Sequence, residues 1–212
     1  MLEKTGEVLK NYPATAAKIV NRTLARMEGT VRAQAAQHLP KVFGLPAREV
    51  SDALKKGRRR VRAIVGGAGE GSLAIQISGE LLTATRFRHT PTRPPAAGKR
   101  GRRVQPTLTV YLAGGKKPLQ PGLGADGKRK PVFLARRPGA AGYFLYRRTG
   151  QKNRQGREKL EVLHSLAIPQ MVVAPQVADP LARAVAQAAD RRLAHELDRE
   201  FGRLGSALAG KG

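Results

Sequence analysis

The chain has 212 residues, with 40 Lys and Arg against 15 Asp and Glu, so its formal net charge is +25. It contains no cysteine, which excludes disulfides and thiolate metal sites. It shows no signal peptide and no apolar run of membrane-spanning length, so we expect a soluble, cytoplasmic protein.

The N-terminal part of the chain has helical spacing. Apolar residues recur at steps of three and four from Ala14 to Leu39, where Thr15 is a candidate cap and Pro40 is expected to end the helix. A second, shorter helix is predicted from Pro46 to Lys56, with Gly57 after it.

The middle of the chain alternates between apolar and polar residues, as strands do. Gly139 and Gly142 separate two of these segments, as a hairpin requires. Two other stretches, 91–101 and 119–130, are basic and rich in Pro and Gly, and we expect extended loops there. Strands are predicted over Ser72–Ser78, Leu81–Arg88, Thr107–Leu112, Pro131–Ala135, Gly142–Arg147 and Leu160–Leu166.

The last long segment predicts a helix from Pro180 to about Leu208, with Asp179 as its N-cap. Its apolar residues step mostly by four, so they drift around the helix. Either its two halves pack on different surfaces, one of them a neighbouring subunit, or it has one core face and a frayed end. We therefore expect an α+β fold, in which an antiparallel sheet is flanked by an N-terminal helix and a long C-terminal helix. We expect one domain over residues 1–212, with long basic loops near 91–106 and 115–130.

Two sequence patterns approach catalytic motifs and then depart from them. The run GLGADGKR (122–129) resembles a phosphate-binding loop, but Arg129 stands where Ser or Thr must hold Mg²⁺, which favours a glycine turn with exposed charge. The run HELDR begins like a zinc motif, but Arg199 replaces the second His, which favours a solvated helix surface that includes Glu196 and Glu200. We therefore expect no enzymatic activity, no cofactor and no metal site.

The basic charge is the stronger functional signal. Between Arg86 and Lys159 there are twenty basic and two acidic residues, and so much like charge destabilises a compact state unless a polyanion compensates it. Nucleic acid is the leading candidate, bound through its phosphates and without sequence preference. Anionic membranes, acidic proteins, RNA and a merely solvated surface are the alternatives. Arg136, Arg137, Arg147 and Arg148 add to the basic clusters. The candidate DNA-binding residues are Arg58, Arg59, Arg60, Arg62, Lys99, Arg100, Arg102, Arg103, Lys128, Arg129 and Lys130.

The order of these segments resembles the minor tail protein Z family, the tail-completion proteins of lambda-like tailed phages. In that resemblance Ser72–Pro91 corresponds to an apolar strand, a glycine turn and a second strand. The chain departs from the family in its inserts around 94–103 and 119–130. The resemblance is carried by Ala17–Met27, Val50–Arg60, Ser72–Pro91, Val132–Gln151, Leu160–Val177 and the C-terminal helix.

This resemblance implies a structural protein in the tail neck of the virion, assembled in the host cytoplasm. It implies a homo-oligomeric ring that joins tail to head, surrounds the path of duplex DNA and contacts the tail terminator and head–tail connector proteins. The rival interpretation is a free-standing, non-specific DNA-binding or packaging accessory protein. A weaker third one is a metal-dependent nuclease.

Overall fold

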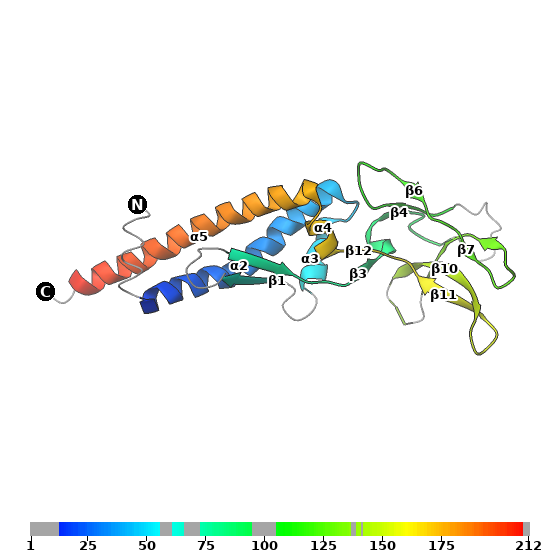
Figure 1. Ribbon diagram of the computed structural model, residues 1–212, viewed down its shortest axis with the longest axis horizontal. Coiled ribbons are helices and arrows are strands. Elements are labelled where there is room, and N and C mark those ends of the chain that lie inside the picture. The colour runs from blue at the N-terminus through cyan, green and yellow to red at the C-terminus, as the bar shows by residue number, and fades with distance from the viewer. Residues whose placement is uncertain are drawn as a thin grey trace.

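The molecule is elongated, with two long helices towards one end and most of the strands at the other (Figure 1). This computed structural model describes residues 13–55, 61–65, 73–94, 105–136, 139–140 and 142–209. Its long helices, α2 (Pro13–Val42) and α5 (Pro175–Ala209), lie antiparallel, and the strands lie between them in the sequence. The predicted α+β fold is confirmed. The shorter helices are α3 (Ala47–Lys55) and α4 (Ile168–Val172).

Helix α2 buries one apolar side chain in nearly every turn. Ile19, Met27, Val31, Ala35 and Leu39 are each at most 2% exposed. Steps of four keep successive side chains adjacent on the helix, while the stripe that they form turns slowly around its axis. The stripe can therefore contact α5 along one part of its length and other elements along another.

Pro40 lies inside the last turn of α2, which continues to Val42, so the prediction that Pro40 ends the helix is wrong. Leu39 and Phe43, on either side of it, are at most 1% exposed, and the Phe43 amide donates to the Leu39 carbonyl. Burial of these two side chains offsets the hydrogen bond that proline cannot donate. Thr15 also lies within the helix rather than at its cap.

Helix α5 begins at Pro175, so the predicted start at Pro180, with Asp179 as the cap, is wrong. Its first turn is closed by the Val177 and Ala178 amides, which donate to the carbonyl of Ala174.

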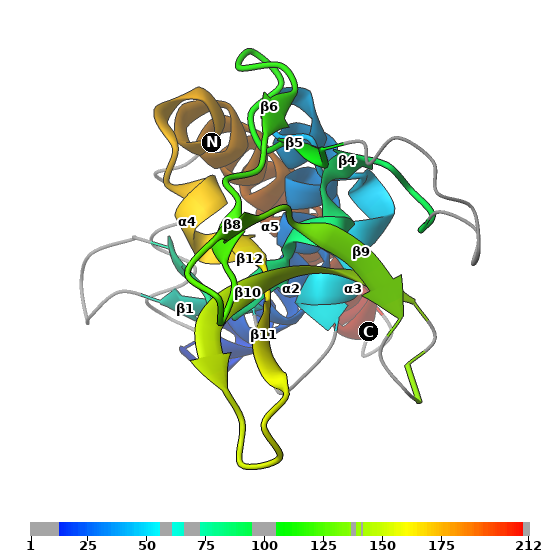
Figure 2. The ribbon, with the colours of Figure 1, turned by 90° about the vertical axis from the view of Figure 1, so that its right-hand side faces the viewer.

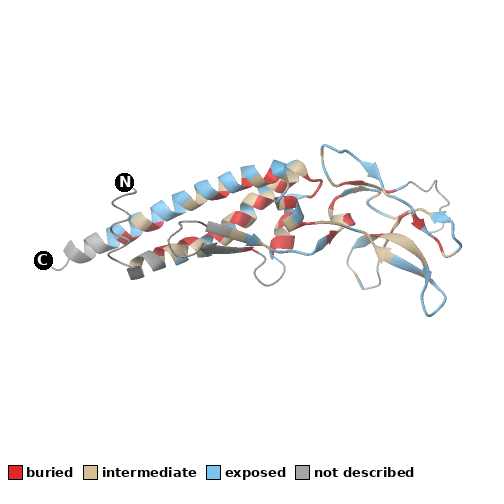
Figure 3. Cartoon of the chain, viewed as in Figure 1, coloured by how far each residue is buried: buried red, intermediate tan, exposed pale blue. Residues whose placement is uncertain are grey.

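Helix α5 has buried positions in both halves (Figure 3), but the kinds of residue buried there differ. In the first half Val177, Leu181 and Val185 are buried and belong to the core. In the second half Leu193 and Phe201 are both 37% exposed, whereas Glu196 and Glu200 are buried. The prediction that these two glutamates lie on a solvated surface is therefore wrong.

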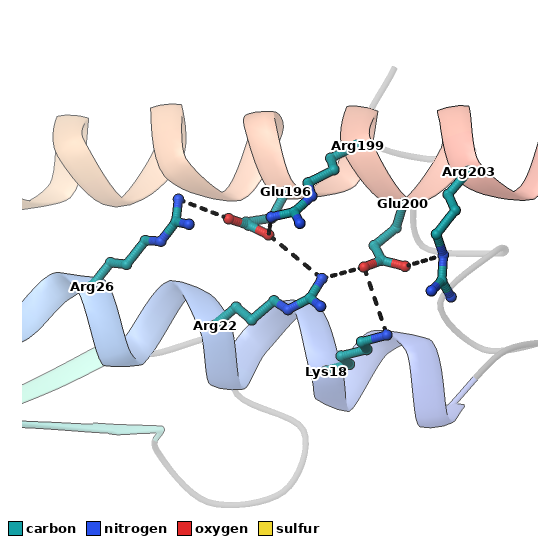
Figure 4. A network of polar contacts seen from close by, with 7 residues as sticks. All are labelled: Lys18, Arg22, Arg26, Glu196, Arg199, Glu200 and Arg203. Atoms are coloured by element: carbon teal, nitrogen blue, oxygen red, sulfur yellow. Dashed lines mark hydrogen bonds and ion pairs between the residues drawn. The ribbon is translucent and has the colours of Figure 1, made fainter.

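The buried glutamates face cations of α2 (Figure 4). Arg26 Nη1 lies 3.1 Å from Glu196 Oε1, and Arg22 donates to Glu200 Oε1 and lies 4.0 Å from Glu196 Oε2. Carboxylates so deeply buried are tolerated only when cations compensate them. This contact, which we call the ion-pair ladder, therefore fixes the register of α2 against α5. The ladder consists of Lys18, Arg22, Arg26, Glu196, Arg199, Glu200 and Arg203.

Glu200 makes the stability of this helix pair depend on pH. Burial raises the pKa of Glu200, but the positive charges of Arg203, Lys18 and Arg22 outweigh it and hold that pKa below its ordinary value of 4.5. A carboxyl group whose pKa is depressed by folding stabilises the fold at pH values above its pKa in the unfolded state. That contribution is lost as the pH falls through its pKa in the folded state.

We expect the unfolding temperature to fall below pH 4.5, and to fall less steeply in Glu200→Gln. The control, Asp198→Asn on the exposed surface of α5, should follow the wild-type curve, and equal slopes in all three proteins would contradict the assignment.

The core lies where the helices meet the sheets, and the connection from α2 to α3 passes through it. Phe43 and Phe87 are both at most 2% exposed there. Between α2 and α3 the Gly44 amide donates to the Val110 carbonyl, and the Gly44 carbonyl accepts from the Arg88 amide at 2.7 Å. These two hydrogen bonds attach the β-rich part to the helices.

In the described part of the chain the strands form four small sheets (Figure 2). In all but one of the pairs the strands are antiparallel; β10 and β7 are parallel. The sheets are β1 (Val61–Val65) with β2 (Leu73–Ile77); β3 (Leu81–Thr83) with β12 (His164–Ala167); β4 (Arg88–Thr90), β5 (Thr107–Thr109) and β6 (Lys117–Pro118); and β11 (Glu158–Val162), β10 (Tyr143–Lys152), β7 (Gly122–Leu123) and β8 (Arg129–Lys130), with β9 (Phe133–Arg136) also on β10.

The predicted strands are correct in outline and wrong in several boundaries. The predicted strand 81–88 is broken by a 3-10 turn, Ala84–Arg86, which sends β3 and β4 into different sheets. The predicted strand 160–166 is likewise divided between β11 and β12, and that at 107–112 is shorter. The two strands that the resemblance implies within 72–91 are present as β2 and β3, although they do not pair with each other: β2 pairs with β1, and β3 pairs with β12. The predicted hairpin around Gly139 and Gly142 is confirmed by β9 and β10.

Among the described residues, no helix combines the length and the apolar character that crossing a membrane requires.

Candidate nucleic-acid interface

Most of the predicted DNA-binding residues lie outside the described residues. This applies to Arg58, Arg59, Arg60, Lys99, Arg100, Arg102 and Arg103. Arg62 belongs to β1, but its side chain is also outside the described part. Only the cluster Lys128, Arg129 and Lys130 can be placed.

This cluster lies on a hairpin formed by β7 and β8, so the prediction of an extended loop over 119–130 is wrong. The Gly124 amide donates to the Lys128 carbonyl, and Gly127 has a φ of +72°, which favours glycine. The interpretation of GLGADGKR as a glycine turn is thereby confirmed. The hairpin lies close against β10: a Cβ added at Gly122 would be only 2.4 Å from the Arg148 carbonyl oxygen, so no side chain fits there.

One carboxylate, Asp126, organises the β7–β8 hairpin. Its Oδ1 accepts from the Lys128 amide and its Oδ2 lies 2.8 Å from Lys130 Nζ. The hydrogen bond from Lys130, with that from the Lys128 amide, holds the pKa of Asp126 below its ordinary value. Lys130 is therefore neutralised within the hairpin, while the Lys128 and Arg129 side chains are exposed and meet no carboxylate among the described residues.

A second basic hairpin joins β10 to β11 and extends beyond the rest of the sheet (Figure 2). Asn153 orders its turn, because its Oδ1 accepts from the Gln155 amide at 3.0 Å and the Arg157 amide at 2.9 Å. This hairpin is not among the DNA-binding residues predicted from the sequence. The available signal was the run KNRQGR, which combines a glycine-containing turn with alternating basic residues. Its exposed cations are Lys152, Arg154, Arg157 and Lys159.

The carboxylates of this part of the molecule are all paired within it. Besides Asp126, residues 105–136 and 142–162 contain only Glu158 and Glu161. Arg147 Nε donates to Glu161 at 2.5 Å, and Arg148 Nε donates to Glu158. The expectation that Arg147 and Arg148 add to the basic surface is therefore wrong.

Glu158 also links the two basic hairpins. Its Oε1 accepts from the Ala125 amide in the β7–β8 turn, and its Oε2 accepts from Arg148 on β10. The hydrogen bonds from Ala125 and then from Arg148 hold the pKa of Glu158 below its ordinary value, so it is ionised at neutral pH. The order β11, β10, β7, β8 accordingly places both hairpins in the same sheet.

Aromatic rings of this sheet contact protein groups. Phe133 and Tyr146 stack with their centroids 5.9 Å apart, and the Arg148 guanidinium lies 4.9 Å from the Phe133 centroid. This cation–π contact further restrains Arg148 in the sheet. The exposed groups of the two hairpins are mainly guanidinium and ammonium donors, which suit phosphate oxygens.

No family model, no curated protein and no solved structure matches this chain. Its resemblance to the tail-completion family therefore stays a prediction from the sequence.

Proposed function

We propose that this protein is a structural, non-enzymatic protein that holds duplex DNA through its phosphates, as a tail-completion protein in the neck of a tailed phage. The proposal of DNA binding rests on one observation: Asp126, Glu158 and Glu161 are all ion-paired with basic residues of the same sheet. Because these acids are used internally, the exposed cations of the two hairpins remain for an outside polyanion.

The resemblance supports the placement in a tail neck, and one feature of α5 supports assembly. Leu193, Leu197 and Phe201 recur at steps of four, and the first and last of them are 37% exposed. They form an apolar stripe beside the ion-pair ladder, and apolar surface of this kind suits subunit packing. It fits the interpretation that the second half of α5 packs on a neighbouring subunit.

The DNA part predicts binding to unrelated duplexes with equal affinity and a steep salt dependence. Replacing both Arg154 and Arg157 by Gln should reduce the log–log salt slope by about 1.8, since each phosphate contact contributes roughly 0.9. Lys128→Gln with Arg129→Gln should act similarly. The matched control removes two exposed charges from α5, Arg183→Gln with Arg192→Gln, and should leave the slope unchanged. Fluorescence anisotropy at several salt concentrations measures this, and equal losses in all three variants would show that only net charge matters.

The tail part predicts that the protein co-sediments with purified tails and that tails lacking it fail to join heads. Electron microscopy of tails with and without the added protein is the measurement. A protein that binds duplex DNA but is never found on tails would support the rival, a free-standing DNA-binding module.

A further inference from the structure

The sheet of β4, β5 and β6 places two rows of polar residues on one of its faces. Arg88 pairs with Thr109, and Thr90 pairs with Thr107. Because Leu108 pairs with Lys117 in β6, the same register continued by one residue places Lys116 opposite Thr109. Side chains at paired positions share a face, and neighbours along a strand alternate. Arg88, Thr109 and Lys116 therefore form one row.

These residues line a hollow of about 260 Å³. The groups that line it include two cations and three hydroxyls, and the described residues around it contribute no carboxylate. Thr109 is 7% exposed, while the Arg88 and Lys116 side chains are exposed and meet no acidic partner among the described residues. His89, Leu112 and Gly115 complete the lining.

Backbone hydrogen bonds hold the hollow in shape. The Arg88 amide donates to the Gly44 carbonyl at 2.7 Å, which ties β4 to the connection between α2 and α3. The Gly115 amide donates to the Leu112 carbonyl at 3.1 Å, and Gly115 has a φ of +61°, a conformation that favours glycine. The cations thus extend from a fixed strand and a fixed turn.

We propose that this hollow binds a single phosphate group. Arg88 and Lys116 supply charge-assisted hydrogen bonds from two sides, and the threonine hydroxyls supply neutral donors to the remaining oxygens. The volume is below the roughly 300 Å³ at which sites for drug-sized ligands begin, which suits one tetrahedral anion and its waters. The phosphate belongs either to a free ion or to a DNA backbone; only the second source rests on the function proposed above.

The probe is inorganic phosphate, titrated into the ¹⁵N-labelled full chain. Saturable shifts are expected at residues 88–90, 107–109 and 114–116. Arg88→Gln and Lys116→Gln should each weaken binding about tenfold, as loss of a charge-assisted hydrogen bond does. The matched control is Lys117→Gln, the adjacent exposed lysine in register with Leu108 on the other face, which should change the affinity less than twofold.

The absence of saturable shifts, equal losses in Lys116→Gln and Lys117→Gln, or equal binding of acetate would overturn the proposal. Addition of duplex DNA then identifies the source. Displacement of phosphate by the duplex assigns the site to the DNA backbone, and simultaneous binding of both assigns it to a free phosphate. Phosphate binding can still be measured if the protein binds no duplex DNA. Failure of the proposed function is therefore distinguishable from failure of this site.

Discussion

Gly44→Ala is expected to lower the free energy of unfolding by about 3 kcal/mol, at the upper end of what overpacking costs. A Cβ at this position would lie 2.1 Å from the carbonyl oxygen of Thr109 and 3.3 Å from its Cβ. The nearest atom, the Thr109 carbonyl oxygen, belongs to the backbone, so it cannot move aside by rotation as a side chain could. Gly44 also makes the two hydrogen bonds that join the helices to β4 and to Val110, and relief of the clash would break them.

The control for this prediction is Gly29→Ala, in the middle of α2. Nothing lies within 4 Å of a Cβ there, and alanine is the better helix former. This variant should gain about 0.5–1 kcal/mol. Urea unfolding followed by circular dichroism measures both variants. Wild-type stability in Gly44→Ala would mean that the connection between α2 and α3 moves freely relative to β5.

Glu196→Lys is expected to destabilise the protein by about 3–5 kcal/mol, the usual effect of breaking a buried ion pair from one side. The Glu196 side chain is fully buried, and Arg26, Arg199 and Arg22 lie 3.1, 3.9 and 4.0 Å from its carboxylate. A lysine there would place a fourth cation among three.

A charge swap separates this electrostatic cause from simple loss of packing. Adding Arg26→Glu to Glu196→Lys restores an opposite-charge pair, so the double variant should regain a large part of the lost stability. Asp198→Lys makes the same charge change on the exposed surface of α5 and should stay within about 0.5 kcal/mol of wild type. If the swap is no more stable than Glu196→Lys alone, the ion-pair ladder contributes nothing through its charges.

The helices were predictable because their apolar periodicity is long, but their ends were not. Both boundary errors came from treating proline as a helix boundary: Pro40 was expected to end one helix, and Pro180 was expected to begin the other. Pro40 and Pro180 lie inside helices, between residues whose buried side chains, such as Leu39 and Leu181, offset the missing hydrogen bond. That compensation depends on tertiary contacts that local spacing does not contain.

The burial of the glutamates could not be predicted for the same reason, since it also depends on tertiary contacts. In the sequence, Glu196 and Glu200 look like ordinary surface charge, because their cations lie near the other end of the chain. The signal was complementary spacing: glutamates four apart on α5, and Lys18, Arg22 and Arg26 four apart on α2. It becomes visible only once the two helices are known to be antiparallel neighbours.

For the proposed DNA interface, the sequence predicted clusters of exposed cations and only part of their location. Lys128 and Arg129 are exposed as expected, but Lys130 is neutralised by Asp126. The β10–β11 hairpin has no comparable signal in the sequence, because its cations alternate with polar residues instead of forming a run. Strand pairing converts that alternation into one projecting basic turn.

The pairing of charges also differs between the two ends of the molecule. Five carboxylates lie on α5, and the ion-pair ladder places two of them against α2, whereas the β-rich end uses its few carboxylates internally and keeps exposed cations. Among the described residues the positive charge is therefore concentrated at the β-rich end, which gives this part of the chain an electric dipole moment along its long axis. In the field of a polyanion such a dipole experiences a torque, which turns the β-rich end forward before any contact is made. Towards a polyanionic partner, the placement of a few carboxylates would in this way favour one orientation of approach.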